Sequence, residues 1–100
     1  MEEYSITILT SAQIDILDVV EHLNILPPDE AAQYYDLFTS KVGSLKTAPD
    51  SYPLAKDTQL RLRGYRTMPI KDFTVFYTVR SNTIEIRRVL FSRKQYEWLF

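Results

Sequence analysis

Alternating apolar and polar positions begin the chain and return over its second half. Residues 4–9 read YSITIL, a period of two that is typical of a short strand. The same period recurs from about residue 60 and predicts three further strands at 60–69, 73–80 and 83–91. Pro69 cannot donate to a central ladder, so it should lie on an edge strand or end the first of these three.

Between the first strand and residue 49 the apolar spacing becomes helical. A first helix should begin near Ala12, behind hydroxyl N-caps at Thr10 and Ser11, and stop before the prolines at 27–28. A second helix should be capped by Asp29 and end near the lysines at 41 and 46. The short connection predicts that the two helices pack as an antiparallel hairpin.

The order of elements is therefore β-α-α-β-β-β, followed by a short C-terminal helical tail that Ser92 could cap. This order predicts an α+β fold with the helical hairpin on one side of a mainly antiparallel sheet. One hundred residues hold a single core, so one domain over residues 1–100 is expected.

Composition narrows the chemistry. The chain has no cysteine and one histidine, which excludes disulfides, thiolate metal sites, a cysteine nucleophile and multi-histidine zinc sites. It also lacks a glycine-rich phosphate loop and a nucleophile elbow, and we expect no cofactor and no metal. No apolar run approaches the ~20 residues of a membrane span, and the acidic start does not resemble a signal peptide, so a cytoplasmic protein is expected.

Charge is split between the two halves of the chain. Residues 1–50 carry −7 and residues 51–100 carry +6, which indicates a surface for a polyanion or an acidic peptide in the second half. Arginine offers forked donors to phosphate, and an aromatic ring can stack on an unpaired base. In the alternative reading the aromatics, such as Tyr65 and Tyr77, fill the core while the arginines border it. The basic residues that could bind such a partner are Arg63, Arg66, Lys71, Arg87, Arg88, Arg93 and Lys94.

The acidic residues and the histidine give no obvious acid–base pair. Asp15, Asp18 and Glu21 are expected on the solvent face of the first helix, and His22 is expected at the surface. Glu85 could pair across the sheet with a strand arginine.

Several segments, in this order and spacing, resemble the RelE/ParE superfamily of toxins over nearly the whole chain. They are Thr10-Ser11-Ala12 with Asp15, Ala31-Ala32, the exit from Leu45 to Pro49, Gly64-Tyr65-Arg66-Thr67-Met68-Pro69, Phe73-Thr74-Val75-Phe76-Tyr77 and Arg88-Val89-Leu90-Phe91-Ser92-Arg93. The resemblance implies the toxin half of a bacterial type II toxin–antitoxin pair with this fold, neutralised by a small cognate antitoxin. RelE-like members cleave mRNA on the ribosome without a metal, whereas ParE-like members inhibit DNA gyrase.

The residues carried over from the resemblance divide between these two branches. For a RelE-like endoribonuclease, the implied catalytic residues are Arg66, Arg93 and Tyr96. Met68 stands where a lysine would be expected, and Thr74 stands where the middle strand would carry an arginine. The ParE-like branch, which has no known hydrolytic centre, is therefore slightly favoured. In a third reading, a degenerate toxin binds its antitoxin without harming cells.

Overall fold

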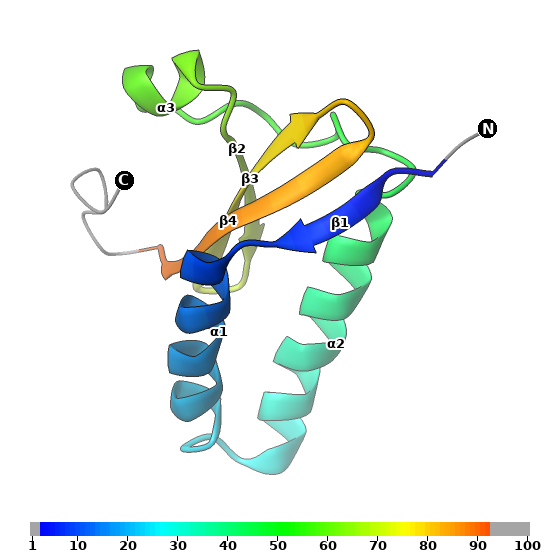
Figure 1. Ribbon diagram of the computed structural model, residues 1–100. Helices are drawn as coiled ribbons and strands as arrows, with labels where there is room; N and C mark the ends of the chain where they lie inside the picture. Colours follow the sequence, from blue (N-terminus) through cyan, green and yellow to red (C-terminus); the bar gives the residue numbers. More distant parts are fainter. Residues whose placement is uncertain (1–2, 93–100) are drawn as a thin grey trace.

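The computed structural model describes residues 3–92, drawn in colour in Figure 1. The elements are β1 (Ser5–Ile8), α1 (Thr10–Leu23), α2 (Pro28–Ser44), α3 (Thr58–Leu62), β2 (Arg66–Ile70), β3 (Phe73–Arg80) and β4 (Thr83–Phe91). The predicted α+β fold is confirmed, with one additional short helix, α3. The expected C-terminal helical tail, with Arg93, Lys94 and Tyr96, lies outside the described residues.

The four strands form one sheet in the order β1-β4-β3-β2. β2, β3 and β4 are consecutive antiparallel strands joined by tight turns at Lys71 and Ser81, both in the left-handed region with φ of 54° and 50°. β1 enters beside β4 and runs parallel to it, with Ser5 opposite Thr83 and Ile8 opposite Ile86. The sheet is therefore mainly antiparallel, as predicted, and its N-terminal strand is placed by residues about 80 positions away.

Both long helices lie on the same side of the sheet (Figure 1). α1 packs mainly against β4, and α2 contacts β2. The main core lies between the two long helices and the sheet. It includes the fully buried Met68, Val75, Tyr77, Ile84 and Ile86. We call this side of the sheet the helix face.

The helix caps differ from those expected. The N-cap of α1 is Leu9 rather than a hydroxyl residue, and no side chain caps it. In α2 the N-cap is Pro27 and Pro28 occupies the first turn, so Asp29 lies inside that turn rather than capping it. Proline at the first helical position loses no hydrogen bond, because that N–H has no helical partner.

The helix α3 replaces the start of the strand predicted at 60–69. The Asp57 side chain caps it by accepting the Leu60 N–H at 3.0 Å. Gly64 ends the segment with φ of +82°, a conformation that favours glycine. Leu60 of α3 is buried on the opposite side of the sheet, in a second cluster with Ala55, Tyr65, Phe76 and Leu90, whereas Leu62 is exposed. We call this side the open face, because neither long helix covers it.

The two edge strands of the sheet, β2 and β1, differ in the contacts that prevent pairing with a further strand. At β2, Leu54 forms a bridge to Arg66, and the Thr67 N–H donates to the Pro53 carbonyl at 3.1 Å. Further along, Pro69 has no N–H, and its carbonyl accepts from Lys41 Nζ at 2.9 Å. These contacts block pairing with another strand. β1 carries neither a proline nor a charged residue.

No helix among residues 3–92 is long and apolar enough to cross a membrane.

Candidate functional site

A β-bulge in β4 separates two adjacent arginines. Tyr77 pairs with Ile86 while Phe76 pairs with Arg88, so Arg87 has no opposite residue on β3. A bulge inserts one residue and re-aims the side chains that follow it. Arg87 therefore lies on the open face, whereas Arg88 reaches α1.

The bulge also corrects the faces predicted for β4. Strict alternation put Leu90 with Ile84 and Ile86, and Val89 on the opposite side. In the structure Val89 joins Ile84 and Ile86 in the helix-face core, and Leu90 lies in the open-face cluster. One extra residue reverses the alternation for the rest of the strand.

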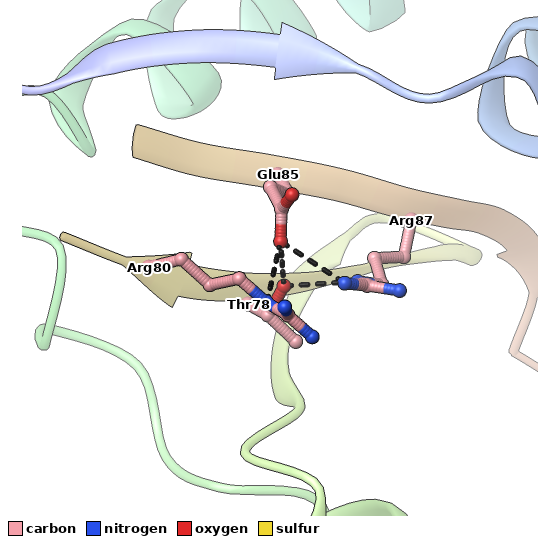
Figure 2. A network of polar contacts seen from close by, with 4 residues as sticks. All are labelled: Thr78, Arg80, Glu85 and Arg87. Atoms are coloured by element: carbon pink, nitrogen blue, oxygen red, sulfur yellow. Dashed lines mark hydrogen bonds and ion pairs between the residues drawn. The ribbon is translucent and has the colours of Figure 1, made fainter. Parts of the chain in front are cut away.

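On the open face, Arg87 belongs to a polar network with three other side chains (Figure 2). Glu85 Oε1 accepts from Thr78 Oγ1 at 3.0 Å and from Arg87 Nη2 at 3.0 Å, and it pairs with Arg80 Nε at 3.1 Å. Arg87 Nε also donates to Thr78 Oγ1 at 2.9 Å. The sequence-based pairing of Glu85 with a strand arginine is confirmed. Two arginines share one carboxylate, so the cluster carries a net positive charge.

The network favours the ionised form of its carboxylate. Partial burial alone would raise the pKa of Glu85. Hydrogen bonds from Arg87 and Thr78, together with the charges of Arg87 and Arg80, outweigh that effect and lower the pKa below its ordinary value. Glu85 therefore stays charged at neutral pH and holds Arg87 in a defined position.

Two arginines cover the ring of Tyr65 at the edge of the same face. The guanidinium carbons of Arg63 and Arg87 lie 5.2 Å and 5.5 Å from the ring centroid. Tyr65 itself is buried. Cation–π contacts of this kind hold the arginine heads in place over the ring. Arg63, Arg80 and Arg87 thus form a basic surface, which we call the arginine surface.

Arg88 makes a different kind of contact. Its Nε and Nη2 donate to the two carboxylate oxygens of Asp15 on α1 at 2.7 Å and 2.9 Å. The Asp15 carboxylate also accepts the Val89 N–H at 3.0 Å, a ladder position beyond the end of β1. These hydrogen bonds raise the pKa of the Arg88 guanidinium further. The expectation that Asp15 lies on the solvent face is wrong, since it is buried, whereas Asp18 and Glu21 are exposed as expected.

Arg66 lies on the helix face, away from the arginine surface. It pairs with Tyr77 across β2 and β3 and donates to the Tyr52 carbonyl at 2.7 Å, with Asp50 at 3.7 Å. The Tyr77 hydroxyl donates to the Pro49 carbonyl at 2.8 Å, and burial raises its pKa to about 12. Together these side chains fix the loop before α3.

Lys71 lies at the β2–β3 turn beside α2, apart from the other basic residues. Its Nζ is 3.5 Å from Gln33 Oε1 and 5.2 Å from the centroid of the Tyr34 ring. The Tyr34 hydroxyl donates to Asp72 at 2.8 Å, and that bond raises the pKa of Tyr34. His22 is half-buried rather than fully solvated, and packs edge-on against Phe91 at 5.0 Å between centroids.

Thr74 faces a shallow hollow of about 480 Å³ on the open face. The Thr74 hydroxyl lies 2.8 Å from the Ser92 hydroxyl. The hollow is also lined by Thr67, Pro69 and Phe76, and Lys56 is the cation among its lining residues. Within residues 3–92, no group of three His, Cys, Asp or Glu side chains could hold a metal ion.

Neither the Asp15–Arg88 pair nor the bulge is predicted from the sequence pattern. A signal for the pair was available, because Asp15 lies three residues after Ala12 and four before Val19, within the apolar stripe of α1. No comparable signal marks the bulge.

The same arrangement of helices and sheet is found in chains of two solved toxin–antitoxin structures. A chain of the chromosomal ParDE toxin–antitoxin system from P. aeruginosa superposes with a TM-score of 0.71 and 18% identity, over 89% of this chain and 96% of that one. A chain of the RelBE2 toxin–antitoxin complex from Mycobacterium tuberculosis superposes with a TM-score of 0.57 and 21% identity, over 89% of this chain and 98% of that one.

At sequence level, residues 6–96 match the profile described as the ParE toxin of the type II toxin–antitoxin system parDE. The chain therefore belongs to the ParE toxin family. A search of curated proteins gives no significant match. The resemblance to the RelE/ParE superfamily and the ParE-like toxin reading are confirmed.

Proposed function

We propose that this toxin arrests bacterial growth by inhibiting DNA gyrase and that a cognate antitoxin neutralises it. One observation favours gyrase over RNA as the target: arginines on the strands are hydrogen-bonded to other residues of the same chain. Arg66 is bonded to Tyr52, and Arg88 to Asp15. Cleaving RNA without a metal requires cations that stabilise the anionic transition state. The hollow beside Thr74 is lined by hydroxyl groups and by one cation, Lys56, which favours a binding protein over a nuclease.

The stacking platforms needed for RNA with splayed bases are also occupied. Tyr65 is covered by Arg63 and Arg87, and Tyr77 is buried with its hydroxyl bonded to Pro49. This supports a protein target over an RNA target for the described part of the chain. If the RelE-like alternative holds, Arg93 and Tyr96 remain its proposed catalytic residues with Arg66.

The target is tested by pulse labelling after induced expression in a bacterial host, following thymidine and methionine incorporation side by side. Gyrase inhibition predicts that thymidine incorporation falls first and that the purified toxin blocks supercoiling by gyrase. A first fall in methionine incorporation, with cut mRNA, would favour the ribosome-dependent endoribonuclease. Normal growth at verified soluble expression would favour a degenerate toxin.

The antitoxin is proposed to contact two surfaces. The arginine surface suits an acidic segment, and Arg63 and Arg87 are its best-placed residues, with Lys71, Arg93 and Lys94 as further candidates. Apolar side chains suit an amphipathic segment, because Ile14 and Leu17 on α1 and Ile25 just beyond it are 57%, 66% and 82% exposed. Arg66 and Arg88, predicted as binding residues, have structural roles in this proposal.

The two surfaces differ in their expected response to salt. An acidic segment on the arginine surface should lose affinity steeply as salt is added, whereas an apolar contact should not. A small protein encoded directly upstream or downstream of the toxin is tested as the antitoxin, by co-expression and by titration at two salt concentrations. Insensitivity to salt would assign the binding energy to the apolar side chains of α1.

A further inference from the structure

The outer edge of β1 is covered at its start, where the Tyr4 N–H donates to the Lys46 carbonyl at 3.0 Å, and it exposes backbone groups beyond that point. Ser5 N–H donates to Asn82 at 2.9 Å, and Leu9 N–H donates to Ile86 at 3.0 Å, so the odd-numbered residues turn toward β4. Backbone groups alternate in direction along a strand. Residues 6 and 8 therefore direct their N–H and C=O groups away from the sheet.

Only one of these four outward groups has a hydrogen bond within residues 3–92. Gln13 Nε2 donates to the Ile8 carbonyl at 2.9 Å, and this carbonyl has a second lone pair. The Ile6 N–H, the Ile6 carbonyl and the Ile8 N–H find no partner in the described part of the chain. Two donors and two acceptors thus lie within three residues.

The edge also lacks the features that prevent pairing at β2. Proteins protect exposed edges with proline, lysine, bulges or a covering segment. β2 has a bridge to Leu54, a proline and the lysine bond to the Pro69 carbonyl, whereas the sequence of β1 is SITI without a bulge. After β1 the chain turns inward, because α1 packs against β4 (Figure 1), and α1 reaches the outer edge through the Gln13 side chain at the Ile8 carbonyl.

We propose that β1 pairs antiparallel with β1 of a second copy of this chain, with Thr7 on the two-fold axis. In this register Ile6 of each copy lies opposite Ile8 of the other. The N–H of each residue then donates to the carbonyl of its opposite residue, and symmetry repeats the exchange. Two four-stranded sheets become one sheet of eight strands.

The second copy is favoured as the occupant because the edge is self-complementary. A two-fold interface requires each patch to fit itself, and the donors and acceptors of residues 6 and 8 match in number, with the Ile8 carbonyl using its second lone pair beside Gln13. Thr7 would face Thr7 of the other copy, a pair that is favourable between antiparallel strands. Ser5 and Thr7 are exposed and uncharged, so no like charges meet at the axis.

Thr7→Cys tests the register directly, because the chain has no other cysteine. Opposite residues at a position without ladder hydrogen bonds have Cα atoms about 4.5 Å apart, which a disulfide can span. Under mild oxidation, the variant should form a cross-linked dimer at least ~10-fold faster than Ser40→Cys, an exposed control on α2. Equal rates for the two variants would overturn the proposal.

Charge reversal at the axis provides a second, independent test. Sedimentation velocity should show wild-type dimers that dissociate on dilution. Thr7→Lys and Thr7→Glu should each dimerise at least ~10-fold more weakly, since like charges would face each other. A mixture of the two variants should recover the dimer. Thermal melts should stay unchanged, because Thr7 is exposed.

Three results would each overturn the proposal. The first is that the wild type stays monomeric up to millimolar concentration. The second is that neither Thr7→Lys nor Thr7→Glu weakens the dimer, and the third is that a mixture of the two variants does not form dimers again. Monomeric toxin whose antitoxin binding is lost in Thr7→Lys would instead assign the edge to an extended segment of the antitoxin. This inference does not depend on the target of the toxin.

Discussion

Arg87 and Arg88 are adjacent in β4, and each bonds a carboxylate, yet the two pairs differ in their surroundings. Arg88 and Asp15 join β4 to α1, with side chains 18% and 8% exposed, and they share the carboxylate with the Val89 N–H. Arg87 and Glu85 are two residues apart on one strand, and both side chains are 21% exposed on the open face. The first pair holds two elements together, whereas the second positions an arginine at a surface that a partner can reach. Charge alone therefore does not identify a binding residue. A counter-ion on another packed element indicates a structural role, whereas a counter-ion on the same strand leaves the arginine at the surface.

The largest expected difference between the two pairs is the loss of folding stability when Arg88 is replaced. Arg88→Ala leaves the buried Asp15 carboxylate without its cation and should destabilise the fold by about 3–5 kcal/mol. Urea unfolding measures the change, with Arg63→Ala, an exposed arginine, as the control that should stay within about 0.5 kcal/mol of wild type. A loss below about 1 kcal/mol for Arg88→Ala would place Arg88 in the same class as Arg87.

Arg87→Ala should separate binding from stability. We expect a stability loss of about 1 kcal/mol, because the pair is partly solvated and Thr78 can still bond Glu85. Antitoxin affinity should fall roughly tenfold, mainly at low salt, because a positioned cation has been removed. Calorimetric titration with the antitoxin and a urea unfolding curve give both quantities. Unchanged affinity would remove Arg87 from the proposed surface.

The smallest effect concerns acid stability. The pKa of Glu85 is lower in the folded protein than its ordinary value of 4.5. Its ionised network therefore contributes full stability above about pH 4.5, and that contribution is lost as the pH falls through the folded-state pKa. Melting temperatures from pH 6 to pH 3 should fall less steeply for Glu85→Gln than for wild type. Glu30→Gln, exposed on α2, should follow wild type, and parallel curves for all three proteins would contradict the expectation.

Much of the fold could be predicted from local patterns. Apolar residues recur with a period of two around Ile6 and Ile84 and with helical spacing in α1. Each pattern reflects one buried face, which can be recognised from the local sequence alone. The segment at 60–62 was mistaken for strand because α3 is a single turn, too short for its spacing to be distinguished from alternation. The arginines of the second half and the pairing of Glu85 with a strand arginine could also be predicted, but the partners of Arg66 and Arg88 could not.

The partners could not be predicted because they are set by geometry between distant segments. Asp15 and Arg88 are 73 positions apart, and only the packing of α1 on β4 brings them together. The bulge at Arg87 decides which side of the sheet each following residue faces, and it follows from pairing with β3. Residues such as Arg66 resemble binding residues in sequence and become structural once the loop at Tyr52 is placed.

The parallel pairing of β1 with β4 has a consequence for the newly made chain. Ser5 leaves the ribosome well before its partner Thr83, because 78 positions separate the two residues in the chain. At about 5–20 residues per second, the first strand waits roughly 4–16 s for its place in the sheet. The Asp15–Arg88 contact has to wait for the same stretch of chain. The toxin therefore completes its sheet only after β4 has been made, which gives antitoxin already present in the cell time to meet it as it folds.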